Sequence, residues 1–127
     1  MSRPLKCITV DEARSLQDNW RTTRGRDISN GRGFEDTFEY WYSIDELQEY
    51  LDYVREKSRE QGVNEPGIRI FLGAYNGRGN KKGYSTVFLA PTMEEKSTND
   101  TEVVKQVNNY AIEPMNDSAG GIPPIKY

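Results

Sequence analysis

The fold is decided by the stretch at residues 43–62, which reads SIDELQEYLDYVREKSREQG. Ser43 and Glu46 form a capping box, the pattern that begins many helices. At about 100° per residue, the apolar side chains share one stripe, and the acidic side chains gather on the opposite side. Gly62 is typical of a residue that ends a helix. The stretch therefore predicts an amphipathic helix over residues 44–61.

Two apolar segments follow this helix. Residues 67–75 read GIRIFLGAY and alternate as a strand does, and residues 84–90 read YSTVFLA. We expect Pro91 to end the second strand, because proline cannot donate a hydrogen bond to a neighbouring strand. Residues 76–83 are rich in glycine and polar side chains and fit the open loop of a hairpin. Since both strands carry apolar residues on both faces, we expect the pair to lie in the middle of the sheet.

Four further elements are expected on either side of this core. A second capping box, at Thr9 and Glu12, begins an apolar pattern with helical spacing. An aromatic-rich run suits a strand, a glycine-rich run suits a loop, and valines at helical spacing near Tyr110 suit a helix. The expected elements are a helix over 10–23, a loop over 25–36, a strand over 37–42 and a helix over 102–112.

The resulting order, α-β-α-β-β-α, predicts a small α+β fold. We expect an antiparallel or mixed sheet of three or more strands with two to three helices packed on it. The length of 127 residues fits one domain, which we place at residues 1–112. Residues 113–127 contain several prolines and a pair of glycines and are predicted to form an irregular C-terminal tail. The pattern does not determine the strand order.

The composition removes several kinds of chemistry. The chain has no histidine and a single cysteine, Cys7. It therefore lacks the imidazole acid–base catalyst and the ligands of the usual zinc sites. Cys7 cannot form an internal disulfide, and we expect a half-buried apolar residue there, with a reactive thiol as the alternative. We expect no metal and no cofactor, and an enzyme is the less favoured class.

The apolar runs are short, and acidic residues occur close to the first methionine. Neither a membrane span of ~20 residues nor a signal peptide is expected. The sequence therefore predicts a soluble, cytoplasmic protein that does not contact a membrane.

The first candidate surface is acidic and aromatic. Its residues are Trp41, Glu49, Asp52, Tyr53 and Glu56. Like charges four residues apart destabilise a helix slightly, so docking to a basic partner, or mimicry of a nucleic acid, would explain the pattern. A solvated helix face is the plain alternative. The favoured function is a non-catalytic protein-interaction or regulatory domain, which acts on another protein as a monomer or homodimer.

The second candidate surface is basic and lies in two glycine-rich segments, residues 24–33 and 77–83. Arginine side chains suit phosphate or carboxylate groups, so the alternative function is binding of an anion, a nucleotide or a nucleic acid. The net charge of -3 weighs against nucleic acid. A histidine-free enzyme that uses paired carboxylates is the third possibility. The basic residues are Arg24, Arg26, Arg32, Arg78, Lys81 and Lys82.

Overall fold

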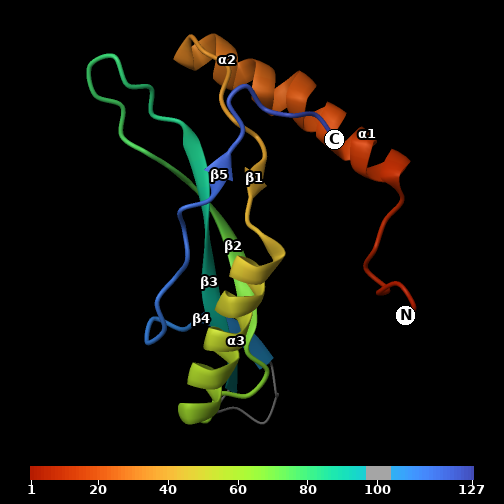
Figure 1. Cartoon of the computed structure of the whole chain (residues 1–127), viewed down its shortest axis with the longest axis vertical. Coiled ribbons are helices and arrows are strands. Elements are labelled where there is room, and N and C mark those ends of the chain that lie inside the picture. The colour runs from red at the N-terminus through yellow and green to blue at the C-terminus, as the bar shows by residue number, and fades with distance from the viewer. Residues whose placement is uncertain (97–103) are drawn as a thin grey trace. The chain divides into compact units, whose positions relative to one another are not determined.

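The computed structural model describes residues 1–96 and 104–127 (Figure 1). The chain divides into two compact units. Unit 1 consists of Met1–Glu39 together with Gly120–Tyr127, and unit 2 consists of Tyr40–Ala119.

Unit 1 contains one continuous helical run. Its parts are α1 (Val10–Trp20), the π-helical turn η1 (Arg21–Gly25) and α2 (Arg26–Arg32). Thr9 begins the run as expected, since its hydroxyl oxygen accepts the Glu12 N–H at 3.1 Å.

The loop expected over 25–36 is wrong in its first part, because residues 26–32 are helical. Gly25 and Gly31 are tolerated inside the run at a modest cost in helix propensity. The run ends at Gly33, whose φ of 80° is left-handed, a conformation that glycine adopts readily.

Unit 2 contains the helix α3 and most of the strands. The elements are β1 (Tyr40–Trp41), α3 (Ile44–Glu60), β2 (Gly67–Ala74), β3 (Ser85–Lys96) and β4 (Val104–Asn108). The last strand, β5 (Ala119–Gly120), begins in unit 2, and its second residue belongs to unit 1. The α+β class and a three-stranded antiparallel sheet are confirmed, and the strand order, which the sequence left open, is β2-β3-β4. β1 and β5 form a separate two-stranded sheet, so the strand expected over 37–42 shortens to two residues.

The helix α3 confirms the strongest sequence pattern. The Ser43 hydroxyl oxygen accepts the Glu46 N–H at 2.9 Å, and the helix ends one residue before the expected boundary. Its buried stripe, Tyr50 and Val54, packs against Leu89 of β3 and against Ile112. These four side chains form the main core cluster of unit 2, and Val87 is buried as well.

Two expectations around β3 are wrong. This strand does not stop at Pro91 but continues to Lys96, and the helix expected over 102–112 is replaced by β4 from Val104 onward. The Pro91 carbonyl accepts the Asn109 N–H at 2.9 Å, so the missing proline N–H would point to the same side of β3. After Asn109 the chain moves away from this side of β3 and returns only at Met115, which pairs with Leu89. No neighbouring carbonyl therefore needs a donor at Pro91.

Residues 113–116 return to β3 as a short extended segment. Leu89 and Met115 exchange two backbone hydrogen bonds, both of 2.8 Å. The Tyr50 hydroxyl lies 2.9 Å from the Glu113 carbonyl oxygen and 3.3 Å from that of Leu89. The Asn116 side chain donates to the Val87 carbonyl at 2.7 Å. The segment is thus tied both to α3 and to the sheet.

The N-terminal residues 1–9 are all exposed. Cys7 is a free thiol in this exposed stretch, so the expectation of a half-buried residue is wrong. None of the helices in the described part of the chain has both the length and the apolar composition that crossing a bilayer requires.

The buried hydroxyl of Tyr50 makes the stability of unit 2 sensitive to alkaline pH. Burial, followed by the nearby Tyr53 and Glu113 charges, raises the pKa of Tyr50 from 10.0 to about 12. The folded state therefore holds the phenol proton more tightly than the unfolded state. Its contribution is complete below pH 10 and is lost as the pH rises towards 12. A shift of this size corresponds to roughly 2–3 kcal/mol of unfolding free energy.

Tyr50→Phe should remove this alkaline loss while costing about 1–2 kcal/mol at pH 7, because the Glu113 carbonyl loses its donor, whereas the Leu89 carbonyl keeps the Met115 N–H. Urea unfolding of both proteins at pH 8 and pH 11.5 measures the difference. Titration of the lysines and other tyrosines is common to both proteins and cancels in the comparison. An equal alkaline loss in the two proteins would contradict the assignment to Tyr50.

Candidate functional site: a charged pocket in unit 1

The π-helical turn η1 brings residues five positions apart onto one side of the helical run. The Arg26 N–H donates to the Arg21 carbonyl, which is a bond across five residues rather than four. In a regular α-helix such residues would be about 140° apart around the axis. Here Trp20, Arg21, Gly25 and Arg26 all line one pocket. Single π-turns inside helices are frequent at functional sites.

The pocket has a volume of about 200 Å³, and all its lining residues belong to unit 1. Its aromatic side is formed by Trp20 and Phe38, whose ring centroids lie 5.6 Å apart at 48°. The Arg21 guanidinium lies over the Phe38 ring, 5.9 Å from its centroid. A Cβ atom at Gly25 would lie 3.0 Å from the Trp20 ring, so glycine allows the indole to lie close against the helix.

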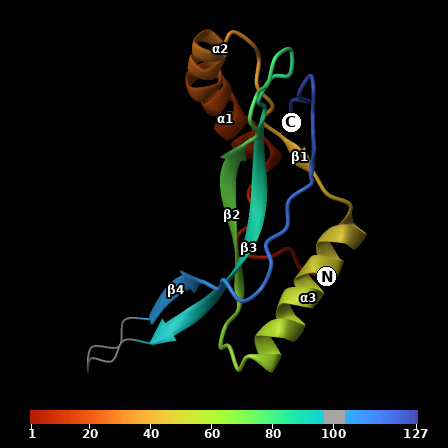
Figure 2. The same ribbon diagram turned by 90° about the vertical axis from the view of Figure 1, so that its left-hand side faces the viewer.

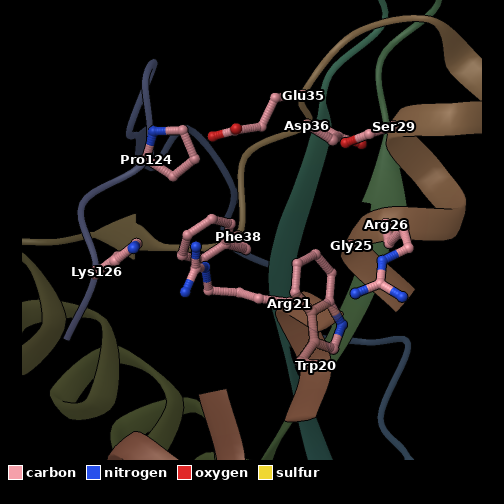
Figure 3. Close-up of a pocket in the computed structure, with 10 residues that line it drawn as sticks. All are labelled: Trp20, Arg21, Gly25, Arg26, Ser29, Glu35, Asp36, Phe38, Pro124 and Lys126. Atoms are coloured by element: carbon pink, nitrogen blue, oxygen red, sulfur yellow. The ribbon is translucent and has the colours of Figure 1, made fainter. Parts of the chain in front are cut away.

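Cations and carboxylates line the rest of the pocket. In Figure 3, the Lys126 ammonium lies on one side of the opening, the Arg26 guanidinium on the other, and the Glu35 carboxylate above the aromatic rings. Arg21 also faces Asp18 at 3.6 Å, and the buried Asp36 accepts the Thr37 N–H at 2.8 Å.

Three charges of this pocket are not neutralised by the protein. Among the described residues, Arg26, Lys126 and Glu35 have no partner at ion-pair distance. All three side chains belong to exposed residues. The pocket therefore presents two cations and one carboxylate to whatever enters it.

Residues 120–127 are attached to the rest of unit 1 by two backbone donors. The Gly121 N–H donates to the Glu39 carbonyl at 3.3 Å, and the Tyr127 N–H donates to the Gln17 side chain at 2.8 Å. A side chain at Gly121 would overlap the Glu39 carboxylate. These contacts hold Pro124 and Lys126 at the rim of the pocket.

The basic residues expected from the sequence fall into both units. Arg24 and Arg32 are exposed on the helical run but do not line the pocket, whereas Arg26 does. In unit 2, Arg78 and Lys81 exchange backbone hydrogen bonds of 3.1 and 2.9 Å and form the tip of the hairpin, followed by the exposed Lys82. No pattern in the sequence pointed to Lys126 or to the π-turn.

The acidic surface lies on α3 in unit 2. Glu49, Asp52 and Glu56 are exposed, and Trp41 is 60% exposed. Local contacts hold two of the carboxylates, since Gln48 donates to Asp52 at 2.9 Å and Arg59 pairs with Glu56 at 2.7 Å.

Tyr53 is half-buried, and its hydroxyl donates to the Glu113 carboxylate. This bond raises the pKa of Tyr53 and lowers the pKa of Glu113. The Tyr53 hydroxyl therefore links α3 to the segment of residues 113–116 that returns to β3.

β2 exposes an apolar edge that the sequence pattern placed in the middle of the sheet. β3 is the central strand and β2 lies at the edge, so that expectation is wrong for β2. Ile70 is 67% exposed and Leu72 is 85% exposed, although both share the face that carries Leu89 and Val87. Alternation revealed the two faces of this strand but not which neighbours would cover them.

A second, apolar cavity of about 300 Å³ lies in unit 2. Phe71 and Phe88 line it and stack with ring centroids 5.1 Å apart, and the exposed Tyr110 lies at its rim. It has no charged lining residue, and its polar side chains are Asn108, Asn109 and Tyr110, so it offers mainly apolar burial.

The described residues show no candidate metal centre, and the comparisons with known proteins show no relative. The described residues contain no group of three or more histidine, cysteine or acidic side chains that could hold a metal ion. No protein-family model matches the sequence, and neither the curated proteins nor the solved structures include a significant match.

Deletions in η1 test whether the π-turn aligns the residues of the pocket. Removing Thr22 alone should restore a regular α-helix in which Arg21 and Arg26 are four positions apart, about 40° around the axis and still on one side. Removing both Thr22 and Thr23 should turn Arg26 by about a further 100° relative to Arg21, and Gly25 by the same angle relative to Trp20. In a Trp41→Phe background, the Trp20 fluorescence should shift to the red in the double deletion and stay unchanged in the single deletion, while far-UV circular dichroism shows a helix in both. An unchanged emission spectrum in the double deletion would contradict this account of the pocket.

Proposed function

We propose that this chain is a small, non-catalytic protein-interaction domain that binds another protein at the edge of β2. The observation that carries the proposal is the exposure of Ile70 and Leu72 along an eight-residue edge strand. Unprotected edge strands recruit a further strand, because their backbone N–H and C=O groups need partners. A bound segment gains main-chain hydrogen bonds from such an edge and specificity from alternate side chains.

Few of the usual protections of an edge strand occur on β2. It contains no proline, and its only charged residue is Arg69. The Arg69 guanidinium is turned back across the sheet and donates to the Asn108 side chain at 2.6 Å and to the Gln106 carbonyl at 2.9 Å. In the described part of the chain, β2 pairs only with β3.

The position of α3 explains why the apolar side chains of β2 remain uncovered. The core beneath α3 is built from Leu89, Ile112 and Met115, and Ile68 is the only β2 residue packed against it. Figure 2 shows α3 inclined to the sheet, so that its N-terminal end lies further from β2 than its C-terminal end does. At that end Ile44 is 86% exposed. Ile70 and Leu72, which lie on one face of β2, offer an apolar surface of the kind that marks an interface.

The charge of α3 favours a partner segment with basic residues. Glu49, Asp52 and Glu56 lie on the helix face opposite the core and are exposed. Acidic side chains around an apolar contact mainly raise the association rate of a basic partner. The acidic surface would thus raise the association rate of the partner, and the β2 edge would bind the partner segment.

Replacing both exposed side chains of the edge tests this function. Ile70→Thr with Leu72→Thr should change the unfolding free energy by less than about 1 kcal/mol, because neither side chain is buried. Capture of partner proteins from the source cells, quantified by mass spectrometry, should fall at least tenfold. Leu5→Thr with Leu16→Thr is the matched control, since both residues are exposed in unit 1. Equal capture by the edge variant and the parent would contradict the proposal. A purified dimer that the edge variant dissociates would assign the edge to a second copy instead.

Charge reversal tests the contribution of the acidic surface. Glu49→Lys with Glu56→Lys should leave the circular dichroism spectrum intact and slow association with the captured partner about tenfold at low ionic strength. Asp11→Lys with Asp27→Lys makes the same change in net charge on exposed residues of unit 1. If both pairs of substitutions slow association equally, the surface on α3 has no specific role.

Anion binding is the second candidate function. The unpaired cations of the pocket in unit 1 favour it, whereas Arg78, Lys81 and Lys82 belong to the hairpin of unit 2.

A further inference from the structure

The pocket of unit 1 offers charges of both signs in a fixed arrangement. Arg26 and Lys126 lie on different sides of its opening, and the Glu35 carboxylate lies across from the aromatic rings (Figure 3). The protein itself uses the remaining charged groups, because Arg21 contacts Asp18 and Phe38, and Asp36 accepts a backbone donor. Three groups are therefore left for a ligand.

The complement of two cations and one carboxylate is a molecule with two carboxylates and one ammonium group. A simple anion satisfies the cations but leaves the Glu35 carboxylate facing a like charge. A neutral amino acid satisfies Glu35 and only one of the two cations. A charged hydrogen bond is stronger than a neutral one, so the match of all three charges determines selectivity.

The size of the pocket limits the ligand to one small metabolite. Its volume of about 200 Å³ is below the ~300–1,000 Å³ of sites for drug-sized molecules. The rings of Trp20 and Phe38 form a wall without hydrogen-bond acceptors, which strengthens electrostatic attraction by excluding water from one side. From these observations we infer that unit 1 binds a free dicarboxylic amino acid, of which glutamate is the simplest probe.

In this assignment the two carboxylates of the ligand lie near Arg26 and Lys126, and its ammonium group lies near Glu35. The π-turn is required, because it brings Arg26 to the same side as Arg21 and Trp20. The contacts of Gly121 and Tyr127 are required as well, because they hold Lys126 at the rim. Unit 1 would thus bind a small molecule at a site separate from the β2 edge in unit 2.

Three probes of nearly equal size test the inference with the full chain. L-glutamate carries all three charges, L-glutamine lacks the side-chain carboxylate, and glutarate lacks the ammonium group. Titrations followed by ¹H–¹⁵N NMR should show saturable shifts of the Trp20 indole and the Gly25 amide with glutamate. Glutamine and glutarate should bind at least tenfold more weakly. No saturable shift with glutamate, or equal binding of glutarate, would overturn the inference, the latter by showing a simple anion site.

Two variants and one control complete the test. Arg26→Gln should weaken glutamate binding at least tenfold. Glu35→Gln should also weaken glutamate but strengthen glutarate, since it removes the only unpaired negative charge described in the pocket. Arg24→Gln, an exposed residue outside the pocket, should change neither affinity. If Glu35→Gln changes both ligands in the same direction, the ammonium subsite is wrong.

Discussion

The backbone pairing between Leu89 and Met115 is the constraint on which the rest of unit 2 depends. It holds residues 113–116 along the side of β3 that β4 has left, and it places Ile112 and Met115 beneath α3. The hydroxyl of Tyr50 satisfies the Glu113 carbonyl from the helix side. A buried carbonyl without a donor would cost about 1–3 kcal/mol, so the helix, the sheet and the returning segment are stabilised together.

This pairing also determines which surface remains open. Because Ile112 and Met115 fill the space beneath α3, the helix packs over β3 and the returning segment and contacts β2 only near Ile68. Ile70 and Leu72 keep the apolar identity of a core strand while remaining exposed. The interaction surface that we propose is therefore a direct consequence of how the core of unit 2 is completed.

The sequence predicted those parts of the fold that depend on local patterns. The α3 helix follows from the Ser43 capping box and one apolar stripe, and β2 follows from alternation. The helix expected over 102–112 failed because valines at helical spacing also suit a strand, and pairing with β3 decided between them. The expectation that the strand ends at Pro91 failed for a similar reason, since the missing N–H of proline matters only where a neighbouring strand needs a donor. The exposure of Ile70 could not be predicted either, because it depends on which part of the chain packs beneath α3, and Ile112 and Met115, which do so, are far from Ile70 in the sequence.

The pocket of unit 1 shows why a candidate site can escape a pattern search. Arg21 and Arg26 are five residues apart, a spacing that separates side chains on an α-helix and joins them only across a π-turn. A π-turn has no sequence signature as clear as a capping box, and a search at α-helical spacing assigns these arginines to different faces. Lys126 reaches the pocket from the opposite end of the chain, held by Gly121 and Tyr127. The pocket therefore arises from one irregular turn and one long-range attachment, and both must persist for its three unpaired charges to act together.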